Sequence, residues 1–188
     1  MPIKLGTIAK TLPFSKAMLG TVLKYQKASP EIAFNSCPFP TSWNEVIEHE
    51  EYEATNDFGK WIITSAVGRM SNIAPRAFDG NNSTYWSCNN SPYTIGIECP
   101  VAIKPTQVYI RHGQLGTSKL QGFNDKTGTW EDLLSISKTT SSAVNINEEI
   151  STENYYSKFQ IVFTRYSSSS ATVTLHEFQI TSGYIKEA

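Results

Sequence analysis

From about residue 60 onward the chain consists of short apolar runs, rich in β-branched and aromatic residues, that are separated by turn residues. In "KFQIVFTRY" the apolar Phe159, Ile161 and Phe163 occupy every second position, as in a strand with one buried face. The run "TVTLHEFQI" keeps this alternation less strictly. The pattern predicts strands at residues 61–67, 94–99, 106–112, 119–124, 130–137, 158–166 and 172–181.

The breaks between these runs contain glycines, prolines and a serine run at residues 167–170. Many short strands at this spacing, with almost no helical period, predict an antiparallel β-sandwich or barrel. No internal repeat is visible in the sequence.

The first 50 residues follow a different pattern. Residues 15–26 hold several apolar side chains and predict a short helix with Ser15 as its N-cap, although Gly20 interrupts it. Three prolines at 30, 38 and 40 exclude a long regular element after it. We therefore predict a partly helical N-terminal extension at residues 1–50, which could serve as an anchor or an oligomerisation segment, and a β-sandwich domain at residues 51–188.

Charge supports this division of the chain. Up to residue 30 the ionisable side chains are all lysines, whereas from residue 31 to 59 they are acidic apart from one histidine. Such a block pattern is typical of a solvated surface, and it also suits a tail that docks on a partner or a neighbouring subunit. The signs of the charges balance in the rest of the sequence.

Composition excludes several classes of function. The chain has 188 residues, 39% of them hydrophobic and 18% charged, which is enough for one core. A net charge of -1 gives no reason to expect nucleic acid or an anionic membrane as partner. Three cysteines cannot all pair within one chain and have no metal-binding spacing, so we expect reduced thiols and cytosolic folding. We expect neither a signal peptide nor a membrane span, because no apolar run is long enough.

The stretch "AFDGNNSTYWS" at residues 77–87 is the densest in candidate chemistry. Asp-Gly and Asn-Asn form turns readily, so the stretch could simply lead into a strand at Tyr85. It also gathers the hard oxygens of Asp79, Asn81, Asn82 and Thr84, the ligand chemistry that Ca²⁺ prefers. A single carboxylate holds calcium poorly, so a site here requires a second acid from elsewhere.

Four segments, taken in order, resemble discoidin-like domains, also called coagulation-factor C-type domains. They are "PRAFDGNNSTYWSC", "YTIGIECPVAIKPTQVYIRHG", "SKLQGFNDKTGTWEDL" and "YYSKFQIVFTRYSSSSATVTLHEFQI". The resemblance covers residues 61–184, about two-thirds of the chain. It implies an all-β, antiparallel jelly-roll sandwich of the galactose-binding-like type, a fold that recurs in carbohydrate-binding modules.

The same resemblance implies a structural calcium site, with a glutamate from the last strand as the second acid. Its ligands would be the main-chain carbonyls of Arg76 and His176 together with Asp79, Asn81, Thr84 and Glu177. The ion would fasten the last strand to the early loop, and Trp86 would pack in the core below it. Alternatively, Glu177 is an outward-facing strand residue or an ion-pair partner.

Relatives that bind galactose-type sugars combine an aromatic platform with polar donors on loops at one end of the sandwich. The corresponding positions here match loosely and give a candidate sugar site of Asn89, Asn90, Tyr93, Arg111 and His112. Each of the last three has a structural alternative: Tyr93 begins a strand, Arg111 pairs with an acid, and His112 is a surface histidine.

Catalysis finds no support in the sequence. No nucleophile, metalloprotease or phosphate-binding motif is present, and the three histidines lie far apart. Asp79 and Glu177 could in principle act as a glycosidase pair, but their context favours metal binding. We therefore expect a protein that is not an enzyme.

Two functions remain open at this point. The chain is either a module that binds a cell-surface glycan, displayed on a larger assembly, or a structural protein whose sandwich makes protein contacts without sugar. An apolar basic start and a sandwich at the end resemble fibre, collar or decoration proteins of tailed bacteriophages. That resemblance implies a virion protein made in the host cytoplasm, which contacts other virion proteins or its own copies through the extension.

Overall fold

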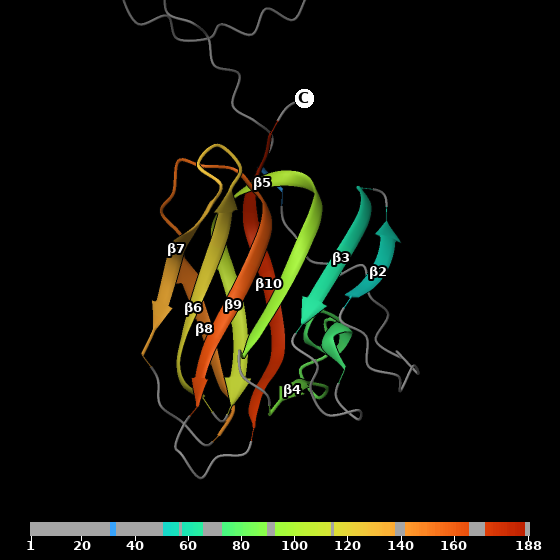
Figure 1. Ribbon diagram of the computed structural model, residues 1–188, viewed down its shortest axis with the longest axis vertical. Coiled ribbons are helices and arrows are strands. Elements are labelled where there is room, and N and C mark those ends of the chain that lie inside the picture. Colours follow the sequence, from blue (N-terminus) through green and yellow to red (C-terminus); the bar gives the residue numbers. More distant parts are fainter. Residues whose placement is uncertain are drawn as a thin grey trace, which may run out of the picture.

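The computed structural model describes residues 31–32, 51–56, 58–65, 73–89, 93–113, 115–137, 142–165 and 172–186 (Figure 1). The helix predicted at residues 15–26 lies outside this set, as does most of the predicted extension. No helix in the described part of the chain is long and apolar enough to cross a membrane.

The described chain is almost entirely strand, with one short 3₁₀ helix between the third and fourth strands. The elements, in order, are β1 Glu31–Ile32, β2 Glu51–Asn56, β3 Gly59–Ser65, η1 Ala74–Ala77, β4 Trp86–Cys88, β5 Thr94–Gly113, β6 Leu115–Asn124, β7 Thr129–Ile136, β8 Val144–Glu149, β9 Tyr156–Arg165 and β10 Val173–Ile185.

Strand β5 joins two layers because it bends midway and pairs differently on each side of the bend. Its first part pairs with β3 and β9, and its second part pairs with β10 and β8. The pairing with β9 slips between Glu98 and Ile103, where β5 arches over the end of the molecule (Figure 1). One layer is therefore β2-β3-β5-β9-β6-β7, and the other is β10-β5-β8 with β1 and β4 on the far edge of β10. Every strand pair in the described part of the chain is antiparallel, so the predicted sandwich is confirmed.

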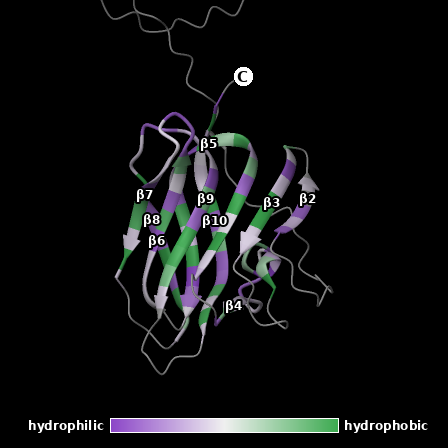
Figure 2. Cartoon of the chain, in the orientation of Figure 1, coloured by the Kyte–Doolittle hydropathy of each residue, from purple (hydrophilic) through white to green (hydrophobic). Residues whose placement is uncertain are grey.

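The core lies between these layers and follows from the alternation along the strands. Figure 2 shows hydrophobic and hydrophilic residues alternating along several strands. Ile97 from the first part of β5 and Ile110 from its second part are both buried, one from each layer. Trp86 is also buried, as the sequence predicted, and its ring lies 5.9 Å from that of Phe163.

The structure differs from the predicted strands in two ways. The runs predicted at 94–99 and 106–112 are one continuous strand, because the two prolines between them fall at the bend of β5. Strands β2, β4 and β8 were not predicted: β4 has three residues, and β8 has a single buried residue, Ile146. In addition, Glu31 and Ile32 of the predicted extension pair with Tyr184 and Gly183 of β10, and the boundary at residue 50 stays a prediction.

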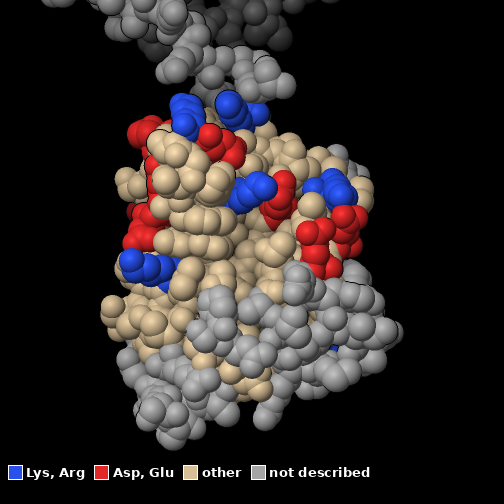
Figure 3. Space-filling model, in the orientation of Figure 1, with Lys and Arg blue, Asp and Glu red and all other residues tan. Residues whose placement is uncertain are grey.

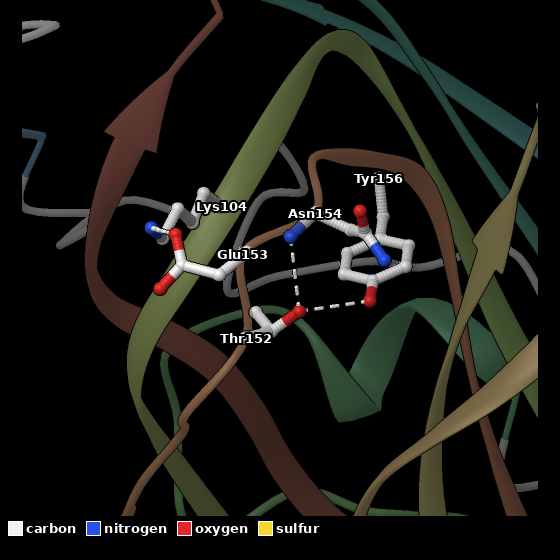
Figure 4. A network of polar contacts seen from close by, with 5 residues as sticks. All are labelled: Lys104, Thr152, Glu153, Asn154 and Tyr156. Carbon is white, nitrogen blue, oxygen red and sulfur yellow. Dashed lines mark hydrogen bonds and ion pairs between the residues drawn. The ribbon is translucent and has the colours of Figure 1, made fainter.

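The turn that leads into β9 is held by side chains of its own (Figure 4). The hydroxyl of Thr152 accepts a hydrogen bond of 3.1 Å from the main-chain N–H of Asn154 and lies 2.9 Å from the phenolic oxygen of Tyr156. Lys104 on β5 forms an ion pair of 2.7 Å with Glu153. These contacts fix the turn against the bend of β5.

Candidate functional site

The segment from η1 to Thr84 brings several oxygen atoms around one hydroxyl group. The Oγ1 atom of Thr84 lies 2.8 Å from Asp79 Oδ2, 2.8 Å from the carbonyl oxygen of Asn81 and 3.4 Å from that of Arg76. A threonine hydroxyl donates only one proton, so it cannot satisfy three acceptors together. Oxygen acceptors are thus in excess here, which is the arrangement that a cation stabilises.

Glu177 reaches this segment because β10 contains a β-bulge. Leu175 pairs with His112 and Glu177 pairs with Arg111, which leaves His176 as the extra residue. Register places Glu177 on the outer face of its layer beside Arg111, yet its side chain is only 1% exposed. Glu177 is therefore outward-facing by register, as one alternative supposed, but it is covered and not exposed to solvent. No ion pair reaches Glu177 among the residues that the structure describes.

The two acids of the predicted metal site are close enough to perturb each other. Burial and, after it, the negative charge of Asp79 together raise the pKa of Glu177 to about 8. Burial also raises the pKa of Asp79, against the opposing hydrogen bonds from Thr84 and the N–H of Asn81. Neither carboxylate oxygen of Glu177 has a hydrogen bond of good geometry. The nearby side chain of Gln179 and the N–H groups of Gly80 and Asn81 oppose the rise of its pKa only in part.

These residues fit the predicted calcium ion. Two adjacent buried carboxylates, one of them with both oxygens lacking hydrogen bonds, lie with the Thr84 hydroxyl and main-chain carbonyls of the same loop. The donor set is oxygen only, as hard cations require. Only two acidic side chains contribute to this set, and within the described ranges no group of three or more His, Cys, Asp and Glu side chains could hold a metal ion. The other ligands would therefore be the hydroxyl and carbonyl oxygens. The imidazole of His176 contacts the carbonyl oxygen of Asn82 at 3.3 Å, whereas the prediction concerned the His176 carbonyl.

The structure separates the residues of the predicted sugar site. His112 has no exposed surface, so it cannot contact a sugar, and its proposed role is wrong. The physical reason is that Arg111 and His112 are consecutive strand residues and point to opposite faces of the sheet. Tyr93 packs partly against the core, Asn89 is half-buried after β4, and Asn90 lies outside the described residues.

A cluster that the sequence did not reveal surrounds Arg111 on the outer face of the layer β10-β5-β8. Its Nη1 donates a hydrogen bond of 2.7 Å to Asn145 Oδ1 on β8. The phenolic oxygen of Tyr109 lies 2.9 Å from Asn82 Oδ1 and 3.3 Å from the same Asn145 oxygen. Tyr109 could have been found from the period-two alternation with Arg111, whereas Asn145 lies on a strand that was not predicted.

The cluster continues to the bulge of β10. The ring of Tyr85 lies 5.2 Å from the imidazole of His176, measured between centroids. Burial lowers the pKa of His176, and the positive charge of Arg111 lowers it further, so the imidazole is neutral near pH 7. We call this cluster the Arg111 patch, and its members are Asn82, Tyr85, Tyr109, Arg111, Asn145 and His176.

A polar hollow of about 640 Å³ lies further along the same strands. Gln107 in its lining precedes Tyr109 by two residues on β5, and Glu149 pairs with Gln107 from β8. The hollow is also lined by Thr106, Ile150, Ser151 and Ser182. Its position puts it on the same layer as the Arg111 patch.

Solved structures share this fold although no protein-family model matches the chain and no curated protein has a significantly similar sequence. The family 32 carbohydrate-binding module of NanJ from Clostridium perfringens, in complex with galactose, is 12% identical, with a TM-score of 0.53; the match covers 66% of this chain and 93% of that one. The C-terminal domain of a Bacteroides fragilis chitobiase is 17% identical, with a TM-score of 0.52, over 72% of this chain and all of that one.

A larger protein contains a similar domain. A family 89 glycoside hydrolase from Clostridium perfringens is 17% identical over 68% of this chain, with a TM-score of 0.54, but the match covers only 14% of the hydrolase. These likenesses show the fold: the chain has the β-sandwich of these modules, which is the fold that the resemblance to discoidin-like domains implied.

Proposed function

We propose that this chain is a non-enzymatic carbohydrate-binding module whose sugar contacts lie on the Arg111 patch. The observation that carries the proposal is the arrangement around Arg111, where a guanidinium and an aromatic ring are both fixed by asparagine side chains. A sugar needs an apolar surface for its ring face and fixed donors for its hydroxyls, and this patch offers both.

Hydrogen-bond capacity at the patch suits a polyhydroxylated ligand. The Oδ1 atom of Asn145 already lies within hydrogen-bond distance of Arg111 and Tyr109, so the two amide donors of this exposed side chain remain for a ligand. The guanidinium of Arg111 has five donors, of which Asn145 takes one and the buried Nε–H is out of reach of a ligand, so three remain. Hydroxyl oxygens of a sugar are suitable acceptors for both groups.

We also propose that Ca²⁺ binds between Asp79 and Glu177 and stabilises the loop that carries Asn82. The bound ion would neutralise two buried carboxylates, which is its whole chemical contribution here. Asn82 would then be held in place for its contacts with Tyr109 and His176. The loop residues thus link the metal site to the sugar surface without placing the ion in contact with the sugar.

Similar structures support binding in preference to catalysis. The NanJ module is itself solved with galactose, and in the glycoside hydrolase the matching domain is a small part of the chain. The acids near the patch are committed to the proposed metal site, which leaves no carboxylate pair for hydrolysis there. Location on a bacteriophage virion and contacts with other virion proteins stay predictions from the N-terminal extension.

A glycan array tests this function. The full chain, displayed as a multivalent complex, should bind a restricted set of glycans, because single sites of this kind have affinities of roughly -4 to -8 kcal/mol. Arg111→Ala should remove the binding at an unchanged melting temperature, and Lys60→Ala, which removes another surface cation, should bind as the wild type does. Retained binding by Arg111→Ala would refute the patch, and no binding by the wild type at high density would refute the function.

A further inference from the structure

The opposite layer carries an aromatic pair, an exposed tryptophan against a half-buried phenylalanine, that the proposed sugar surface does not use. Trp130 on β7 is 39% exposed and pairs in register with Phe123 on β6. Their ring centroids lie 5.2 Å apart at 66°. Phe58 is the other large hydrophobic side chain that is strongly exposed in the described part of the chain.

The orientation of this pair follows from the residue that precedes it. A Cβ at Gly122 would lie 2.6 Å from the ring of Tyr156, so this position faces the core and only glycine fits there. Phe123 must then face outward, together with its cross-strand partner Trp130. The aromatic pair is therefore a fixed feature of the outer face of the layer β3-β5-β9-β6-β7.

A row of polar side chains borders the aromatic pair. Gln121 and Asp132 form the next cross-strand pair on the same face, about 7 Å along the strands. The side-chain amide of Gln121 donates a hydrogen bond of 2.7 Å to Asp132 Oδ1, and that of Gln160 on β9 donates one of 2.7 Å to Gln121 Oε1. These bonds hold the side chains in place and still leave one amide N–H on each glutamine and lone pairs on Asp132 for a ligand.

Charge on this face is balanced within the protein. Lys119 pairs with Asp132 at 2.6 Å, and Lys158 pairs with Glu98 at 2.9 Å. In Figure 3 positive and negative groups lie side by side on this face, among a larger uncharged surface. An uncharged ligand is thus the one that this surface favours.

We propose that an uncharged sugar ring stacks on Trp130 and that its hydroxyls contact Gln121, Asp132 and Gln160. The proposal adds a second site to the proposed carbohydrate-binding function and rests on it. A protein partner is less suitable, because 39% of a tryptophan is on the order of 100 Å² against ~800 Å² per partner in a stable complex. The two sites lie on opposite layers, so one chain could bind two branches or two chains of a glycan.

Tryptophan fluorescence gives a direct test on the full chain, with lactose, chitobiose and cellobiose as probes and glucuronic acid as a charged comparison. At least one of the neutral disaccharides should change the emission of the wild type. Trp130→Phe should lose this change, because Trp61 and Trp86 are 4% and 1% exposed. The fourth tryptophan, Trp43, lies outside the described residues, so Trp43→Phe serves as its control and should respond as the wild type does. Phe58→Ala, which removes another exposed aromatic side chain, should respond as the wild type does.

Affinity measurements complete the test. Trp130→Ala should weaken binding of the responding disaccharide at least tenfold, and Trp130→Phe should weaken it less. Gln121→Ala should weaken it by a factor of a few. The melting temperature of each variant would identify one that has misfolded. A wild type whose emission does not change, or Trp130→Phe with unchanged affinity for that disaccharide, would overturn this site. If this second site is overturned, the proposed function would still be supported by glycan-array binding that is lost in Arg111→Ala. A wild type that binds no glycan on the array or in the fluorescence assay would overturn both the second site and the proposed function.

Discussion

Removal of calcium should make the stability of this protein fall as the pH rises from about 5 to 8. In the metal-free protein, burial raises the pKa of Glu177 from 4.5 to about 8, and it raises that of Asp79 as well. A group with a raised pKa in the folded state contributes stability that is present below its unfolded pKa. This stability is lost as the pH rises through the folded pKa. A carboxylate in an ion pair usually has a lowered pKa, and the stability of the protein then rises with pH instead.

The size of the effect follows from the shift of Glu177. Between its two pKa values folding takes up one proton, so stability changes by about 1.4 kcal/mol per pH unit. The shift from 4.5 to about 8 corresponds to at most about 5 kcal/mol across this range. In a domain of this size that amounts to a melting temperature lower by on the order of 10 °C at pH 8 than at pH 5. Because the charges of Asp79 and Glu177 interact, the pH at the midpoint of this change is a property of the two carboxyl groups together and not of Glu177 alone.

Calcium should reverse this slope, because the ion binds the two acids in their charged form. The stabilisation by 1 mM calcium should therefore grow from pH 5 to pH 8, as expected for a ligand that binds only the folded state. Protein freed of metal on a chelating resin and exchanged into each buffer would be melted with and without calcium. Glu177→Gln should melt independently of calcium and, without metal, should be more stable than the wild type at pH 8.

Glu153→Gln provides the matched control, since the side chain of Glu153 is 95% exposed and should change neither the slope nor the calcium response. A metal-free wild type that is as stable at pH 8 as at pH 5 would refute the burial argument. A calcium response that survives in Glu177→Gln would refute the assignment of Glu177 as a ligand.

Two further predictions concern the scaffold. Gly122→Ala should lower the free energy of unfolding by about 1–3 kcal/mol in urea titrations, because its Cβ would overlap the Tyr156 ring; Gly128→Ala, with open space around its Cβ but a positive φ, should cost less. Deletion of residues 1–50 should leave a folded sandwich by circular dichroism and remove self-association in sedimentation, with a small loss of melting temperature from the absent β1 pair with β10. An unfolded truncation would place part of the extension in the core.

Sequence pattern alone predicted the strands whose β-branched, aromatic and other apolar residues form a distinct run between turn residues, even where the alternation is not strict, as in β10. It could not predict that residues 94–113 form one strand, because the change of partner at its bend depends on which strands lie beside each part. It also missed β8, in which only Ile146 is buried and the exposed residues are polar. Such a strand is stabilised by its neighbours more than by its own composition.

The candidate site shows the same limit. Asp79 was expected from turn chemistry and Glu177 from the family resemblance, but burial of Glu177 on the outer face could not be read from the sequence. It depends on the loop that folds over β10 and on the bulge at His176, both of which are tertiary features. The same strand geometry explains why Arg111 remained a candidate and His112 did not.

The contacts of Asn82 explain why a structural metal could influence binding at a surface that it does not touch. The side chain of Asn82 contacts Tyr109, and its carbonyl oxygen contacts His176, so one residue of the calcium loop touches two members of the Arg111 patch. Without a cation, the two buried acids oppose closure of this loop over β10 as the pH rises through the raised pKa of Glu177 and both acids become charged. Opening of the loop would withdraw Asn82 and leave Arg111 and Asn145, which belong to regular strands, in place. Metal binding at Asp79 and Glu177 would therefore act on the shape of the proposed sugar surface, whereas the guanidinium that carries the proposed recognition is positioned by the sandwich itself.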